Sequence, residues 1–147
     1  MRYIKSCGFV AYKRIENVNH YLIIQSLNGD VGFPKGHMES GESELETAIR
    51  ELKEETGVEN VSLVSGDIFS LEILTVDGHM KKGKYVPSHL HFNITYLAEA
   101  DENQVLVVNE KENKGVKWFT FEEVLKVSSE PWMVERIYKK LIGKMNM

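Results

Sequence analysis

Residues 36–58 read GHMESGESELETAIRELKEETGV, and they predict an irregular loop that leads into one amphipathic helix. Ser43 and Glu46 form a capping-box pattern, so the helix is expected to begin near Ser43. Gly57 is suited to end it in a left-handed conformation. Apolar residues at the spacing i, i+3, i+4, i+7 predict its buried stripe: Leu45, Ala48, Ile49 and Leu52.

Three glutamates, Glu51, Glu54 and Glu55, share a face of this helix beside the apolar stripe. Their i, i+3 and i+4 relation lets the carboxylates converge, and Glu55 is expected to be partly shielded from water. Clustered like charges are unfavourable, and a hard divalent cation with oxygen ligands offsets them. On these glutamates alone, the simpler interpretation is a solvated acidic face balanced by Arg50 and Lys53.

Acidic charge is concentrated in this segment. It holds seven acidic and two basic residues, a charge of −5, whereas the whole chain carries −4. The rest of the chain is therefore close to neutral. Broad nucleic-acid binding is not favoured by such a balance, so nucleic acid is not an expected partner.

The complete spacing changes the interpretation. Gly36, Glu42, Arg50-Glu51-Leu52, Glu54-Glu55 and Gly57-Val58 match the Nudix box in full, and the chain therefore resembles the Nudix hydrolase family. The resemblance implies Mg²⁺, with Mn²⁺ as an alternative, and a phosphoanhydride in a nucleoside diphosphate-linked substrate. It implies metal ligands that comprise Glu51, Glu54, Glu55 and the backbone carbonyl of Gly36.

The resemblance also assigns roles to neighbouring residues. Arg50 holds the carboxylates in place, and Glu42 braces the loop against the helix. A further carboxylate is expected a few residues before Trp118, where we favour Glu112 over Glu110. For the base that accepts the proton of the attacking water, Glu51 or Glu54 is the first choice and Glu112 is the second.

The pattern around the box predicts one α/β domain over residues 1–147, and this pattern is compatible with the Nudix αβα sandwich, with a mixed sheet, a central box helix and a C-terminal helix. Strands are expected at 3–13, 20–25, 61–64, 67–75, 89–98 and 117–119. Helices are expected at 121–126 and after Pro131, where apolar residues share one face: Val134, Ile137, Tyr138, Leu141, Ile142 and Met145.

Substrate contacts are expected outside the box. The stretch Phe33-Pro34-Lys35-Gly36-His37 resembles dinucleoside tetraphosphate hydrolases, and related stretches occur in nucleoside triphosphate pyrophosphohydrolases. Lys35 and the lysines of residues 77–91, Lys82 and Lys84, are candidates to bind substrate phosphates. A solvated lysine loop is the alternative. A zinc site of His79, His89 and His91 is not favoured, because no cysteine accompanies them.

The remaining features bear on location and on competing functions. The single cysteine, Cys7, lies in an alternating apolar run and is interpreted as a buried strand residue. With no disulfide and no membrane-spanning stretch, a cytoplasmic protein with a small-molecule substrate is expected, with its oligomeric state left open. The alternatives are a nucleotide-sensing Nudix module without catalysis and an RNA 5'-end pyrophosphohydrolase.

Overall fold

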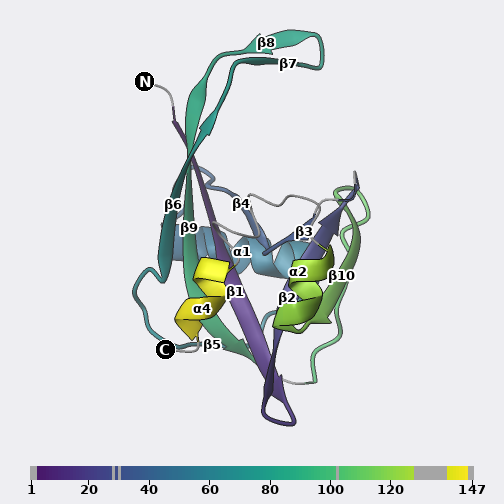
Figure 1. Ribbon diagram of the computed structural model, residues 1–147. Helices are drawn as coiled ribbons and strands as arrows, with labels where there is room; N and C mark the ends of the chain where they lie inside the picture. Colours follow the sequence, from purple (N-terminus) through teal and green to yellow (C-terminus); the bar gives the residue numbers. More distant parts are fainter. Residues whose placement is uncertain (1–2, 28, 30, 102, 128–138, 146–147) are drawn as a thin grey trace.

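The computed structural model describes residues 3–27, 29, 31–101, 103–127 and 139–145. Thirteen elements are assigned in these ranges (Figure 1). The strands are β1 (Tyr3–Ile15), β2 (Val18–Ser26), β3 (Val31–Gly32), β4 (Lys35–His37), β5 (Val61–Leu63), β6 (Ser70–Val76), β7 (His79–Lys81), β8 (Lys84–Val86), β9 (His89–Ala100) and β10 (Asn113–Phe119). The helices are α1 (Glu44–Thr56), α2 (Phe121–Val127) and α4 (Lys139–Met145).

The main sheet is mixed, as predicted. Its central order is β10-β2-β1-β9-β5, and β1 runs parallel to β9, whereas its other pairings are antiparallel. Strands β1 and β2 pair only near their connecting turn and then diverge. Beyond that point β4 pairs with β1 and β3 pairs with β2. The β3–β4 segment thereby carries Lys35 and Gly36 along the centre of the sheet.

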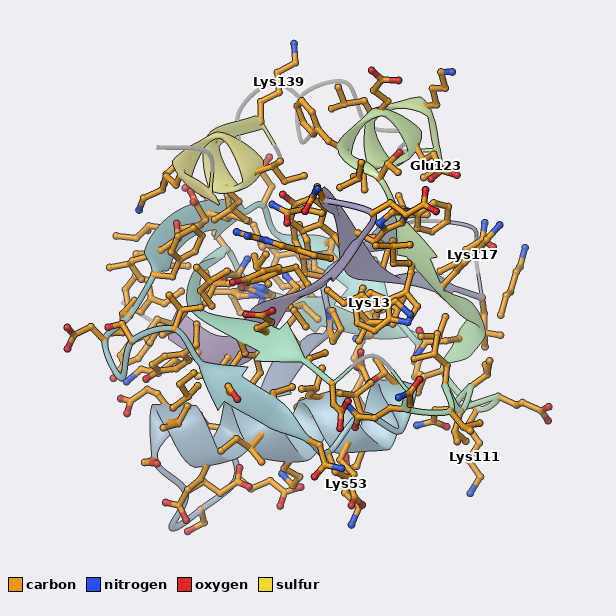
Figure 2. The ribbon with its side chains drawn as sticks, turned by 90° about the horizontal axis from the view of Figure 1, so that it is seen from below. Lys13, Lys53, Lys111, Lys117, Glu123 and Lys139 are labelled. Carbon is orange, nitrogen blue, oxygen red and sulfur yellow. The ribbon has the colours of Figure 1, made fainter. Side chains whose placement is uncertain are left out.

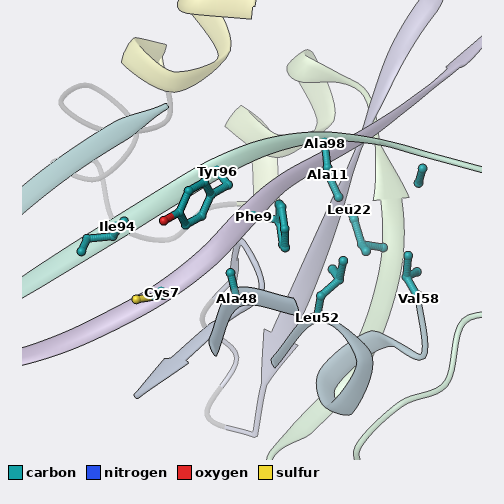
Figure 3. Close-up of a cluster of buried hydrophobic side chains, with 11 residues drawn as sticks. Cys7, Phe9, Ala11, Leu22, Ala48, Leu52, Val58, Ile94, Tyr96 and Ala98 are labelled. Carbon is teal, nitrogen blue, oxygen red and sulfur yellow. The ribbon is translucent and has the colours of Figure 1, made fainter. Parts of the chain in front are cut away.

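Helices cover both faces of the sheet. Helix α1 lies on one side, and α2 and α4 lie on the other (Figure 2). Alternate residues of β1 enter the two cores: Phe9 and Ala11 pack toward α1, whereas Val10 and Tyr12 pack toward α2 and α4. Figure 3 shows the α1-side core, to which Leu52 contributes from the helix. The αβα sandwich predicted from the sequence is confirmed.

Helix α1 begins and ends as predicted. Ser43 is its N-cap, and both hydrogen bonds of the capping box with Glu46 are present. Gly57 ends it with φ 79°, a left-handed conformation that costs glycine little. The prediction that Ile49 belongs to the buried stripe is wrong, since Ile49 is 47 % exposed. The sheet covers a narrower arc of the helix than the spacing alone suggests.

Within residues 77–91, residues 79–86 form a two-stranded hairpin rather than a loop, and residues 89–91 begin β9. Strands β7 and β8 make their own small sheet, which projects from the body of the molecule (Figure 1). Of the predicted C-terminal face, Leu141 and Ile142 are buried, whereas Val134, Ile137 and Tyr138 lie outside the described residues. No helix within the described part of the chain is long and apolar enough to cross a membrane.

Candidate active site

Arg50 lies at the centre of the carboxylate cluster. Its guanidinium donates to both carboxylate oxygens of Glu42, at 2.6 and 3.0 Å. It also donates to Glu51 at 2.7 Å and to Glu54 at 3.1 Å. A further hydrogen bond of 3.0 Å reaches the backbone carbonyl of His37. One side chain therefore ties the loop before α1 to two glutamates of the helix.

Glu42 joins the loop to the helix. Besides Arg50, it accepts hydrogen bonds from the Thr47 hydroxyl at 2.9 Å and from the backbone N–H of Glu39 at 3.0 Å. The hydrogen bonds from Arg50, followed by that from Glu39, lower the pKa of Glu42 to about 2. Glu42 is therefore ionised throughout the neutral range.

Glu51 lies directly under the backbone of Gly36. Its side chain is 12 % exposed, and burial raises its pKa against the opposing effect of Arg50. A Cβ added at Gly36 would coincide with the Glu51 carboxylate. Glycine at this position is what allows the loop backbone and the carboxylate to approach so closely.

Replacing Gly36 with alanine is therefore expected to displace the loop or Glu51. A shift of about 1 Å at a catalytic centre can cost roughly a hundredfold in rate, so we expect a loss of that order in kcat. Steady-state hydrolysis together with circular dichroism tests this. Gly66→Ala is the matched control, because a Cβ there meets open space. Equal rates for both variants would contradict the close approach.

Glu55 is the most buried carboxylate of the cluster, at 6 % exposure. Burial, followed by repulsion from Glu51 and Glu112, raises its pKa to about 8. A hydrogen bond from the backbone of Lys35 and the charge of Lys35 oppose this rise. Its Oε2 atom is buried without a hydrogen-bond partner among the described residues. Such an oxygen calls for a donor or a cation.

Glu112 comes from the loop before β10, where its backbone N–H donates to the carbonyl of Asn109 at 3.0 Å. It is exposed, yet its negative charge raises the pKa of both Glu51 and Glu55. The fold thus brings Glu112 close to the helix glutamates. Glu110 is not among the charges that raise the pKa of either carboxylate.

These observations fit a hard divalent cation. The unpartnered oxygen of Glu55, the glycine over Glu51 and the mutual repulsion of the carboxylates each favour one. Glu54, with 54 % side-chain exposure, has the freedom to turn toward it. No three His, Cys, Asp or Glu side chains already stand as a metal-binding group in the described ranges. Arg50 accounts for this in part, since it holds Glu51 and Glu54.

The three predicted substrate lysines are separated in the structure. Lys35 lies beside the cluster, where desolvation lowers its pKa and Glu55 opposes the change. Lys82 and Lys84 are exposed at the tip of the β7–β8 hairpin. Lys82 and Gly83 both have positive φ, as the tight turn requires. The structure brings only Lys35 to the carboxylates, and phosphate binding by any of the three stays a prediction.

The histidines of residues 77–91 are separated in the same way. His79 is exposed on the hairpin, while His89 and His91 lie on β9 near His37. Sequence reasoning missed His37 as a member of this group. Its contact depends on the pairing of β4 with β1, which the local pattern does not reveal.

A cleft of about 650 Å³ lies elsewhere, between the β1–β2 turn and the start of α2. Arg14, Tyr21, Phe121 and Glu122 are among the residues that line it. None of the residues predicted to bind metal or substrate takes part. Because its single carboxylate cannot form a multidentate site, the chemistry is better placed at the α1 cluster.

A comparison with known protein families assigns the domain. The model of the NUDIX domain matches residues 10–141. The chain belongs to the NUDIX domain family. This Nudix chain is accordingly a hydrolase that acts on pyrophosphate bonds.

Individual relatives of the Nudix chain point in the same direction. It is 30 % identical over 133 residues to the bis(5'-nucleosyl)-tetraphosphatase [asymmetrical] of Rattus norvegicus, covering 85 % of this chain and 84 % of the relative. It is 36 % identical over 77 residues to an RNA pyrophosphohydrolase of Brucella anthropi, covering 50 % and 44 %. A C. elegans Ap4A hydrolase binary complex shares the fold, with TM-score 0.73, 24 % identity and 97 % of each chain covered.

Proposed function

We propose that this Nudix hydrolase cleaves dinucleoside polyphosphates, with bis(5'-nucleosyl) tetraphosphates as the leading substrates, and that it requires a divalent cation. The observation that carries the metal requirement is the buried Glu55 oxygen, which has no hydrogen-bond partner among the described residues and lies near the charges of Glu51 and Glu112. The substrate class is supported by the tetraphosphatase relative, which matches most of the chain. Nucleoside triphosphates are the second substrate class.

Mg²⁺ would be held by Glu51, Glu54, Glu55, Glu112 and the carbonyl of Gly36, with Mn²⁺ as an alternative. When bound, the cation supplies neutralisation of the diphosphate charge and Lewis-acid activation of water. Arg50 positions the carboxylates, because it donates to Glu51 and Glu54 at once.

The reaction is a displacement at phosphorus. The water oxygen forms a new P–O bond, the bridging P–O bond breaks, and the leaving phosphate departs with the bonding electrons. Glu51 or Glu54 accepts the proton of the water, with Glu112 as the second choice of base. Lys35 beside the cluster donates to phosphate oxygens, and so, we propose, do Lys82 and Lys84 of the hairpin.

A substrate panel tests the proposal. Purified protein is incubated with Mg²⁺ and with diadenosine tetraphosphate, nucleoside triphosphates, ADP-ribose or a 5'-triphosphate RNA, and the products are identified by chromatography. We expect preferred cleavage of the tetraphosphate into a nucleoside monophosphate and a nucleoside triphosphate. Chelation by EDTA should abolish it and added Mg²⁺ should restore it.

The panel also decides between the competing functions. Glu54→Gln should lose activity, and Glu59→Gln on the surface serves as its control. Binding without turnover of any member would favour the nucleotide-sensing module. Preferred turnover of RNA would favour the 5'-end pyrophosphohydrolase, which the RNA pyrophosphohydrolase relative suggests over half of the chain. The acidic charge of the chain argues against that function.

A further inference from the structure

Two histidines of β9, His89 and His91, lie with their rings in contact. His89 and His91 point to the sheet face opposite α1, because alternate residues such as Tyr96 pack toward the helix. Their Nε2 atoms are 3.0 Å apart. His89 is 5 % exposed, and its Nδ1 lies 2.9 Å from the backbone carbonyl of Pro87. The pair is therefore built into the strand rather than free in solvent.

These two contacts determine where the protons are. A carbonyl oxygen only accepts, so Nδ1 of His89 carries a hydrogen. In the neutral ring, Nε2 of His89 is then an acceptor, and Nε2 of His91 must donate to it. Nδ1 of neutral His91 is left with a lone pair and has no hydrogen-bond partner among the described residues. It can donate to an anion only after it takes up a proton.

The neighbours of His91 are basic side chains, and they lie beside the acidic cluster. Desolvation lowers its pKa, and the nearby His89, Lys35 and His37 lower it further. Lys35 in turn interacts with Glu55, which links this group to the carboxylates. The facing residues of the neighbouring strands, Leu74 and Ile4, are apolar.

The acid on the next position of β6, Glu72, does not compensate these positive groups. It is held by Lys140 at 2.6 Å and by the Ser70 hydroxyl at 2.9 Å. Asn93, two residues after His91 on the same side of β9, has a buried Oδ1 without a donor in the described part of the chain. Because this oxygen is an acceptor, it does not bind an anion, and the contacts to an anion are assigned to His91 and Lys35.

We propose that His91, whose tautomer is set by His89, binds a phosphate of the substrate and takes up one proton from solvent as it does so. The new N–H group forms at Nδ1 of His91 and donates to a phosphate oxygen, while the Nε2–H of His91 continues to donate to Nε2 of His89. The carboxylates would hold the cation that neutralises one part of the phosphate chain, and His91 with Lys35 would bind the next. This assignment of the anion to a substrate phosphate rests on the proposed function.

The direct test uses sulfate, which does not titrate near neutral pH. Imidazole nitrogen and carbon signals are followed by NMR against pH in sodium chloride and in sodium sulfate of equal ionic strength. We expect His89 in the Nδ1–H tautomer in both salts, and a His91 pKa that is raised by sulfate. Lys53→Gln, on the exposed surface where Lys53 pairs with Glu59, should show the same rise. An unchanged His91 pKa, or an Nε2–H tautomer of His89, would overturn the proposal.

The second measurement uses His91→Gln with diadenosine tetraphosphate and Mg²⁺. Loss of a charge-assisted hydrogen bond should raise KM about ten- to hundredfold and leave kcat within about threefold, because the contact is made in the ground state as well. Wild-type KM in a folded His91→Gln variant overturns the proposal. If no diphosphate is hydrolysed at all, the proposed function fails, while the sulfate titration still decides the role of His91.

Discussion

Glu55→Gln is expected to abolish hydrolysis and to stabilise the metal-free protein. Glutamine has nearly the shape of glutamate but no charge, so it removes a cation ligand from the buried end of the cluster. Several kcal/mol of transition-state stabilisation depend on such a cation, which corresponds to a loss in kcat of about a thousandfold or more. Initial rates at saturating Mg²⁺ measure it. Glu59→Gln, exposed on the surface, should keep the wild-type rate.

The gain in stability follows from the raised pKa. Glu55 titrates at about 8 in the folded protein, whereas an unfolded glutamate titrates near 4.5. Between these values the unfolded state ionises more readily, so the wild-type free energy of unfolding falls as pH rises from 4.5 to 8. Glutamine does not titrate. In EDTA, Glu55→Gln should therefore melt about 3 °C or more above wild type at pH 8, with little difference at pH 5.

The effect of Mg²⁺ on the melting temperature distinguishes Glu55→Gln from the wild type. Added cation should raise the wild-type melting temperature and leave that of Glu55→Gln nearly unchanged, because only the wild type binds it tightly. A variant that hydrolyses at a near-wild-type rate would refute the metal assignment of Glu55. Equal melting temperatures at pH 8 in EDTA would show that the carboxylate is not penalised by burial.

Arg50→Lys is expected to lower kcat about a hundredfold although it keeps the positive charge. An ammonium cannot reproduce the two parallel hydrogen bonds to Glu42 together with those to Glu51 and Glu54. Arg50→Ala should be worse, since it leaves the shielded Glu51 without its cation, at a cost of roughly 3 kcal/mol in the free energy of unfolding. Urea unfolding and steady-state kinetics measure the two effects.

The pH dependence of the free energy of unfolding distinguishes the contact between Arg50 and Glu42 from the other contacts of Arg50. The pKa of Glu42 is lowered to about 2 in the folded protein, so its stabilising effect is complete above 4.5 and is lost as pH falls toward 2. The difference in stability between wild type and Arg50→Lys should shrink across that window. A double-mutant cycle with Glu42→Gln should show strong coupling to Arg50. Additive effects would contradict a shared network.

Much of the fold was predictable because its signals are local. The capping box at Ser43 and Glu46 and the left-handed Gly57 depend on residues within one or two turns. The alternation over 89–98 predicted most of β9, since one face of a strand is set by its own sequence. The wrong assignment of Ile49 came from the width of the buried arc, which depends on how the sheet lies against α1.

By itself, the sequence determined the identity and spacing of the carboxylates, because Arg50, Glu51, Glu54 and Glu55 lie within two helical turns. Only the tertiary structure decided their environment. It placed Gly36 over Glu51, left the Glu55 oxygen buried with no partner in the part of the chain that the structure describes, and brought Glu112 across from another loop. It also separated Lys35 and His91 from the hairpin lysines. Burial and long-range pairing set the charge state of these groups, and neither is encoded in local spacing.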